Sequence, residues 1–208
     1  MSEHVNVKSI LGRGHSCNVF LVEAEENFLV DAGMGMVDRI KKSIGDSNVE
    51  SIVLTHRHID HVADAEELAE ELEATLYAFG EEAKALREGD DMSILSSSFG
   101  KRVSPLDIET LDMDTFSGFE VILTPGHTEE SICLYHKDEK ILFSGDTVFA
   151  NGGAGRTDLP TGDREKLIES IGKLNKLDVE SMYAGHMSVV EGNAGDHIQQ
   201  SLKNLKMF

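Results

Sequence analysis

The segment Thr55-His56-Arg57-His58-Ile59-Asp60-His61 places three histidines and one aspartate within a few residues in the interior of the chain. It directly follows the apolar run Ile52-Val53-Leu54, which is typical of a short buried strand. Imidazole nitrogens and carboxylate oxygens are good ligands for Zn²⁺ and for Fe, Mn or Co. A histidine tag would lie at a terminus and would not contain an aspartate. The segment therefore predicts a metal site.

This segment also connects two secondary-structure elements. A strand is predicted at 51–55, and the helical pattern at about 62–73 keeps its apolar residues on one face. An irregular turn between a strand and a helix can direct the first two histidines one way and Asp60 and His61 another. Such an arrangement suits two metal ions better than one.

The composition of the 208-residue chain, 40% hydrophobic and 27% charged, is ordinary for a globular protein and favours a single domain spanning 1–208. The formal charge of −19 repels polyanions, so nucleic acid is not an expected partner. No apolar stretch is long enough to span a bilayer, and the first residues do not resemble a signal peptide. We expect a cytoplasmic protein that acts on a small-molecule substrate and binds no membrane, with a homo-oligomer among the allowed states.

Periodicity predicts an α/β chain in which strands alternate with amphipathic helices. Cys17 and Cys133 lie in apolar runs and are expected to be buried small hydrophobic residues, not disulfide partners. The segment 81–118 carries no chemical signature and could be a flap over a pocket, a subunit contact or a surface insertion. The strands are predicted at 5–11, 17–23, 27–32, 51–55, 75–79, 119–124, 131–136, 140–144 and 181–184, and the helices at 37–44, 62–73, 82–87, from Asp163 onward, and from Gly195 to the C-terminus.

Four of the apolar strand-like runs end in a residue that can bind metal, and three of these four do so through a glycine: they lead to His56, Gly126-His127, Gly145-Asp146 and Gly185-His186. In α/β sheets, functional groups gather where the carboxyl ends of strands meet loops. Each end could be an independent turn, but four of them together favour one site. The donors are then sufficient for two ions, with His56, His58 and His127 on the first, Asp60, His61 and His186 on the second, and Asp146 as a bridge. Two ions about 3.5 to 4 Å apart can share a water and convert it to hydroxide.

An ordered set of motifs resembles the metallo-β-lactamase superfamily: His56-x-His58-x-Asp60-His61, Gly126-His127, Gly145-Asp146-Thr147 and Gly185-His186. The runs that begin at Asn18 and Asp31 are similar to its early strands, so the resemblance spans nearly the whole chain. It implies an α/β fold, the αββα sandwich of two mixed β-sheets flanked by helices, with the site at one edge. It also implies a hydrolase with two divalent metal ions, Zn²⁺ by default and Fe or Mn as alternatives.

Within that superfamily, Gly155-Arg156-Thr157-Asp158 is similar to the glyoxalase II and persulfide dioxygenase branch. The glyoxalase II resemblance implies a hydroxyacylglutathione hydrolase-like thioesterase, in which a metal-bridging hydroxide attacks the acyl carbonyl. Asp60 would be catalytic, because it would bind metal and orient the nucleophile. Only 22 residues follow His186, so the C-terminal helical domain with which glyoxalase II holds glutathione is expected to be missing.

The persulfide dioxygenases, in contrast, use a single iron, and the resemblance would place it on His56, His127 and Asp146. A lactone or β-lactam hydrolase is a further alternative, and a metal-binding domain without activity is another. Because all second-site donors are retained, the two-metal hydrolase is the leading interpretation. Arg156 is a substrate-binding residue that pairs with a carboxylate, or else a structural residue that pairs with an aspartate such as Asp158.

Overall fold

The computed structural model describes residues 5–101, 103–111 and 114–207. The chain divides into two compact units, Met1–Asp112 and Met113–Phe208. The single domain expected from the length stays a prediction. The predicted segment 81–118 includes three positions outside the described residues (102, 112 and 113), and the predicted C-terminal helix includes one (208).

The first unit contains, within its described residues, a six-stranded mixed sheet in the order β1-β2-β3-β4-β5-β6. The first three strands pair antiparallel, and β3 to β6 pair parallel. The strand β4 is buried along its whole length, as expected for a strand covered on both faces. The strands are β1 (Asn6–Ile10), β2 (Val19–Glu23), β3 (Phe28–Val30), β4 (Ser51–Leu54), β5 (Thr75–Phe79) and β6 (Glu109–Leu111).

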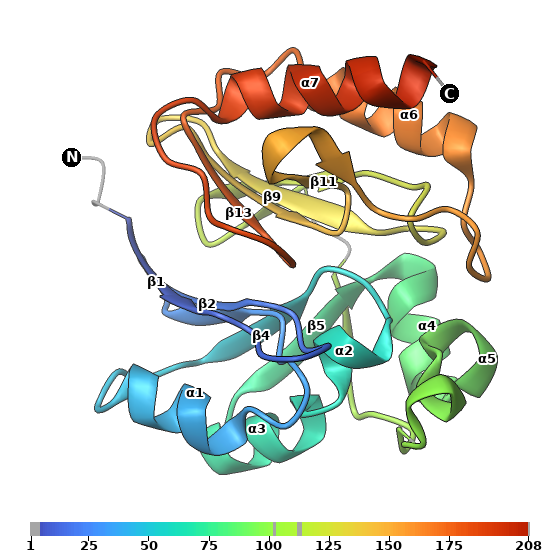
Figure 1. The fold of residues 1–208 in the computed structure, drawn as a ribbon. Coiled ribbons are helices and arrows are strands. Elements are labelled where there is room, and N and C mark those ends of the chain that lie inside the picture. Colours follow the sequence, from blue (N-terminus) through green and yellow to red (C-terminus); the bar gives the residue numbers. More distant parts are fainter. Residues whose placement is uncertain (1–4, 102, 112–113, 208) are drawn as a thin grey trace. The chain divides into compact units, whose positions relative to one another are not determined.

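Figure 1 shows α1 and α3 on one face of this sheet. Ile40 of α1 and Leu68 of α3 are fully buried in one apolar cluster with Ile52 and Leu54 of β4. The helical spacing of these apolar residues explains why the two helices pack on that face. The helices of the unit are α1 (Val37–Ile44), α2 (Ile59–Val62), α3 (Ala65–Leu72), α4 (Gly80–Glu88), α5 (Asp91–Ile94) and the 3₁₀ helix η1 (Ser96–Phe99).

Several boundaries differ from the sequence prediction, and two of the differences concern helices. The helix predicted at about 62–73 is two helices, and α2 already begins at Ile59. The break falls at Asp64, whose carboxylate accepts hydrogen bonds from the backbone amides of Gly35 and Met36, while its own amide donates to Gly33. These tertiary hydrogen bonds replace the local helical ones. The helix predicted at 82–87 is longer, and α4 already begins at Gly80.

The second unit contains, in its described part, a five-stranded sheet in the order β13-β10-β9-β8-β7 and a two-stranded sheet β11-β12. The neighbouring strands predicted at 131–136 and 140–144 form an antiparallel hairpin, β9 with β10, whereas β10 and β13 pair parallel. The strands are β7 (Thr115–Phe116), β8 (Phe119–Leu123), β9 (Ile132–His136), β10 (Ile141–Gly145), β11 (Val148–Phe149), β12 (Gly153–Ala154) and β13 (Ser181–Ala184), and the 3₁₀ helix η2 is Ala150–Gly152.

Two helices, α6 (Arg164–Leu174) and α7 (Ala194–Met207), cover one face of the five-stranded sheet (Figure 1). Leu167 and Ile171 of α6 and Ile198 of α7 pack in one buried cluster with residues of β10 and β13. The helix predicted from Asp163 onward is α6, and Asp163 is its N-cap, since its carboxylate accepts a hydrogen bond of 3.1 Å from the amide of Lys166. Each unit is thus a mixed sheet with flanking helices, which confirms the α/β fold class.

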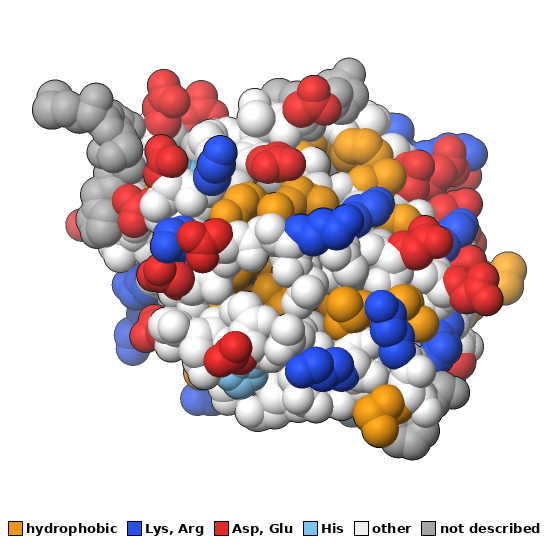
Figure 2. Space-filling model, turned by 90° about the horizontal axis from the view of Figure 1, so that it is seen from above, with side chains coloured by type: hydrophobic (Ala, Val, Ile, Leu, Met, Phe, Trp, Pro, Cys, Tyr) orange, Lys and Arg blue, Asp and Glu red, His pale blue; other side chains and the backbone are white. Residues whose placement is uncertain are grey.

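The two cysteines are free and buried, as predicted. None of the helices formed by the described residues has the length and apolar character that a membrane span requires. Figure 2 looks onto the face formed by α6 and α7, and acidic and basic side chains are mixed over it. That face therefore offers no continuous basic surface of the kind that phosphate backbones need.

Candidate metal centre

The first set of donors follows β4 in the first unit. His56 and His58 lie in the loop after the strand, and His61 lies in α2; all three side chains are buried. The ring of His56 is 4.8 Å from the ring of His58 and 4.1 Å from the ring of His61, centroid to centroid. Asp60 is more accessible, and its Oδ2 is 3.9 Å from Nε2 of His61. Four potential ligands thus lie together within one unit.

Asp31 orients two of these rings. Its Oδ2 is 2.8 Å from Nδ1 of His61, and its carboxylate also accepts hydrogen bonds from the amide and the hydroxyl of Thr55, at 2.8 and 3.0 Å. Because Thr55 donates its one hydroxyl proton to Asp31, the 3.0 Å contact between Thr55 Oγ1 and His56 Nδ1 has the histidine as donor. Asp31 therefore links the end of β4 to the ring of His61.

The backbone of Asp31 is itself unusual, with a positive φ of 62°. This left-handed conformation is uncommon outside glycine, and such strain is often found at functional sites. The amide of Asp31 donates to the carbonyl of Val53 at 2.9 Å, so the conformation is held by the neighbouring strand β4. The result is a buried carboxylate that contacts the ring of His61 directly and the ring of His56 through the hydroxyl of Thr55.

A buried ion pair fixes the residue between the first two histidines. Arg57 is 4% exposed and Glu82 of α4 is fully buried. Glu82 accepts hydrogen bonds from the amide, Nε and Nη2 of Arg57 at 2.9, 2.9 and 3.0 Å, and Nη1 donates to Ser93 of α5 at 3.2 Å. The start of the segment 81–118 is therefore anchored to the histidine loop, a link that sequence patterns did not predict.

The second set of donors lies at three strand ends of the second unit. His127 follows β8, Asp146 follows β10 and His186 follows β13. Oδ2 of Asp146 is 3.6 Å from Nε2 of His127 and 3.6 Å from Nε2 of His186. The strands β10 and β13 are parallel neighbours, and β8 runs in the same direction across β9, so their carboxyl ends share one edge. This sheet geometry brings the three residues together.

The glycine-rich loop positions His127. The carbonyl oxygen of Arg156 lies 2.8 Å from Nδ1 of His127, so the ring donates its Nδ1 proton there. Gly155 permits this approach, because a Cβ at this position would stand 2.0 Å from the carbonyl oxygen of Asp146 and 2.9 Å from Nδ1 of His127. The sequence showed the glycines of the loop but not which of them touches a proposed ligand.

The side chain of Arg156 points to Asp158. Its Nε and Nη2 donate to the two carboxylate oxygens at 2.9 and 2.7 Å, and both side chains are exposed. The hydrogen bonds from Arg156 lower the pKa of Asp158 to about 2, and the same hydrogen bonds raise the pKa of Arg156. The ion pair considered from the sequence is present, and the substrate-binding role of Arg156 stays a prediction.

Cys17 is a neighbour of the first donor set that the sequence did not indicate. Its ligand atom and those of Asp31 and His61 all lie within 4.8 Å of one another, and its amide donates to the carbonyl of Asp60 at 3.1 Å. Burial raises the pKa of this thiol to about 12. Cys17 is therefore a neutral side chain close to His61. Its position in an apolar run predicted that it is buried, but not that it lies near a proposed ligand.

The donor chemistry fits divalent metal ions. His56, His61 and His127 each donate the Nδ1 proton to a protein oxygen, which in the neutral ring puts the lone pair on Nε2. Metal-binding histidines are usually held in this way, with one nitrogen bonded to a protein oxygen and the other facing the ion. Carboxylates lie beside Nε2 in both units, supplied by Asp60 and Asp146. Such mixed nitrogen and oxygen sets suit zinc, iron or manganese.

Comparison with known proteins agrees with this chemistry. A family model described as the metallo-beta-lactamase superfamily matches residues 12–186. The probable metallo-hydrolase MJ0888 of Methanocaldococcus jannaschii is 32% identical, over 93% of this chain and 96% of that protein. The hydroxyacylglutathione hydrolase GloC of Haemophilus influenzae is also 32% identical, over 75% of this chain and 76% of that protein.

The fold has close solved counterparts. TTHA1623 in a di-iron-bound form superimposes with a TM-score of 0.78, over 95% of this chain and 96% of that chain. Its sequence identity of 24% limits the likeness to the fold.

Proposed function

This chain belongs to the metallo-β-lactamase superfamily of metal-dependent hydrolases, and on that premise we propose that it is a binuclear hydrolase of a thioester or a similarly activated acyl bond. The proposal keeps the ligand set that the sequence motifs predicted. Its metal ligands are His56, His58, Asp60, His61, His127, Asp146 and His186.

The observation that carries the proposal is the common orientation of the histidines. Three rings, taken from both units, donate Nδ1 to a protein oxygen and carry the lone pair on Nε2. A histidine that only fills the core has no need of this repeated arrangement, whereas a ligand does. When bound, two divalent ions would lower the pKa of a shared water, supply hydroxide near neutral pH and polarise the acyl carbonyl.

The residues of the chain then have separate roles. Asp60, the more accessible carboxylate of the first set, orients the attacking water by accepting its hydrogen bond. Asp146 lies at 3.6 Å from both His127 and His186, which suits a carboxylate that bridges two ions. Hydrolysis forms a carbon–oxygen bond and breaks the carbon–sulfur bond, so the products are a carboxylic acid and a thiol. The thiol receives its proton from the attacking water.

The proposed substrate class rests on similarity to known relatives, and the proposed location rests on composition. Support for a thioester comes from the hydroxyacylglutathione hydrolase GloC, at 32% identity. Zinc is the default metal of the proposal, and iron is the alternative because nitrogen and oxygen donors suit both metals. Arg156 would contact a substrate carboxylate by exchanging its partner Asp158. A small-molecule substrate, a cytoplasmic location, and no nucleic-acid or membrane partner complete the proposal.

Metal quantification on protein purified without added metal tests the first part. We expect two equivalents of divalent metal and turnover of thioesters that does not depend on oxygen, in a panel that also contains lactones, β-lactams and persulfides. One iron with oxygen uptake on a persulfide would instead indicate the mononuclear dioxygenase. A metal-loaded protein that turns over none of the compounds in the panel would contradict an enzymatic role.

A matched pair of variants tests the ligand assignment. Asp146→Asn should lose activity and bound metal together, because the amide cannot replace a bridging carboxylate. Asp138→Asn, in the exposed turn between β9 and β10, makes the same chemical change and should alter neither. An Asp146→Asn protein with full metal and full rate would show that the bridging assignment is wrong.

A further inference from the structure

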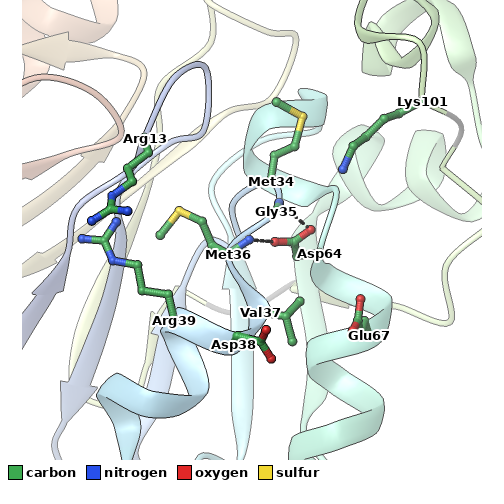
Figure 3. A pocket seen from close by; sticks show the side chains of 10 residues that line it. All are labelled: Arg13, Met34, Gly35, Met36, Val37, Asp38, Arg39, Asp64, Glu67 and Lys101. Atoms are coloured by element: carbon green, nitrogen blue, oxygen red, sulfur yellow. Dashed lines mark hydrogen bonds between the residues drawn. The ribbon is translucent and has the colours of Figure 1, made fainter.

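A cavity of about 480 Å³ lies at the N-terminal end of α1, entirely within the first unit (Figure 3). The loop between β1 and β2, the first turn of α1, the start of α3 and the segment after η1 contribute its walls. The volume is within the range of small-molecule sites, roughly 300 to 1,000 Å³. None of the proposed metal ligands lines it. The cavity is therefore a separate feature of the fold.

Three cationic side chains reach this cavity from three separate segments: Arg13, Arg39 and Lys101. This is notable in a chain with 38 acidic and 19 basic residues, where cations are the minority. Arg39 donates through Nη1 to the carbonyl of Leu11, so its guanidinium lies against the loop that carries Arg13. The two like charges repel each other, and an anion bound between them would offset this repulsion.

The carboxylates of the lining do not neutralise these cations. Asp64 accepts the amides of Gly35 and Met36 and is thereby directed at the start of α1. In Figure 3, Asp38 and Glu67 point away from the two guanidinium groups. Among the residues that the structure describes, no acidic side chain forms an ion pair with the three cations.

The remaining wall is apolar. Met34, Met36 and Val37 line the cavity between the arginines and Lys101 (Figure 3). The sulfur of Met36 is fixed by the hydroxyl of Ser16 at 2.9 Å, whereas Met34 is partly exposed. Thioether side chains adapt to ligands of differing shape. The glycine at 35, with a φ of 71° and open space where a Cβ would be, keeps the entrance unobstructed.

We propose that this cavity binds a small molecule that carries a carboxylate or phosphate group on a short apolar body. The anionic group binds between Arg13 and Arg39, because a guanidinium pairs with two oxygens of either group at once. Lys101 adds charge from the opposite wall, and the methionines contact the apolar part. The site does not depend on the proposed hydrolase activity, since it shares no ligand with the metal centre.

Calorimetric titration of the full-length, metal-containing protein with inorganic phosphate and with butyrate, each at constant ionic strength, tests this proposal. We expect saturable binding of at least one probe, and the tighter probe identifies the anionic group. The double variant Arg13→Gln with Arg39→Gln should weaken this binding at least tenfold. Arg13→Gln alone, in an exposed loop, should weaken it several-fold and does not risk the fold.

The control is Lys42→Gln, which removes one exposed positive charge outside the cavity from α1, the helix that also carries Arg39. It should leave both affinities unchanged. Absence of saturable binding by both probes would overturn the proposal. Equal weakening by Lys42→Gln would also overturn it, because the effect would then be general electrostatics. Binding unaffected by the arginine variants would place the anion elsewhere, for example on the metal ions, and would overturn it too.

Discussion

The ion pair between Arg57 and Glu82 leads to the most demanding prediction, because it links the histidine loop to α4. We consider Glu82→Gln, which keeps the shape of the side chain and removes its charge. Three hydrogen bonds to Glu82, of 2.9, 2.9 and 3.0 Å, would each lose their ionic acceptor. The guanidinium of Arg57, only 4% exposed, would remain charged after losing this carboxylate.

The expected cost follows from this burial. Breaking a buried ion pair by removing one partner typically costs about 3 to 5 kcal/mol, because it leaves an uncompensated charge. Solvent screening does not reduce this figure here, since Glu82 is fully buried. In a chain of this size, each kcal/mol lowers the midpoint of thermal unfolding by about 2 to 4 °C, so we expect a decrease of about 6 to 20 °C. Metal affinity should fall about 10- to 100-fold, since Arg57 lies between two proposed ligands.

Denaturant unfolding monitored by circular dichroism gives the first quantity, and competition with a chelator gives the second. Glu81→Gln is the matched control, because its ion pair with Lys84 is exposed and should contribute no more than about 1 kcal/mol. The double variant Arg57→Met with Glu82→Leu should recover much of the lost stability, since no charge is then buried. A loss below 1 kcal/mol in Glu82→Gln would refute the reasoning.

Three further predictions concern the glycine loop, an exposed ion pair and a buried thiol. Gly155→Ala should lower both the stability of the protein and its metal content, because the new Cβ would stand 2.0 Å from the carbonyl oxygen of Asp146. The control, Gly172→Ala in α6, places its Cβ in open space and should stabilise the fold by about 0.5 to 1 kcal/mol. Arg156→Gln should raise the pKa of Asp158 from about 2 toward 3.8, as measured in a carboxyl NMR titration. Because the native pKa is lowered, the ion pair stabilises the fold above about pH 4, and this stabilisation is lost as the pH falls through about 2. Cys133, whose pKa burial raises to about 11, should resist thiol reagents at pH 8 until the protein unfolds, and fast labelling of the folded protein would argue against its burial.

Much of the fold could be predicted from local pattern. The strand at 51–54 and the helix after Asp163 follow from apolar periodicity and a capping residue, both of which act over a few residues. The helix break at Asp64 could not be predicted, because its cause is a carboxylate that bonds to amides 28 and 29 residues away in sequence. The burial of Cys17 was predictable, but its contact with His61 was not.

The amino-acid sequence by itself determined which residues can bind metal and that each follows a strand, because ligand chemistry and periodicity are properties of short segments. Only the tertiary structure decided how these residues are held: Asp31 contacts the ring of His61, the carbonyl of Arg156 accepts from His127, and Glu82 accepts from Arg57. These partners come from distant parts of the chain, and no local pattern specifies them. They are chosen by strand order and helix packing, which bring buried polar groups together only when the whole unit folds.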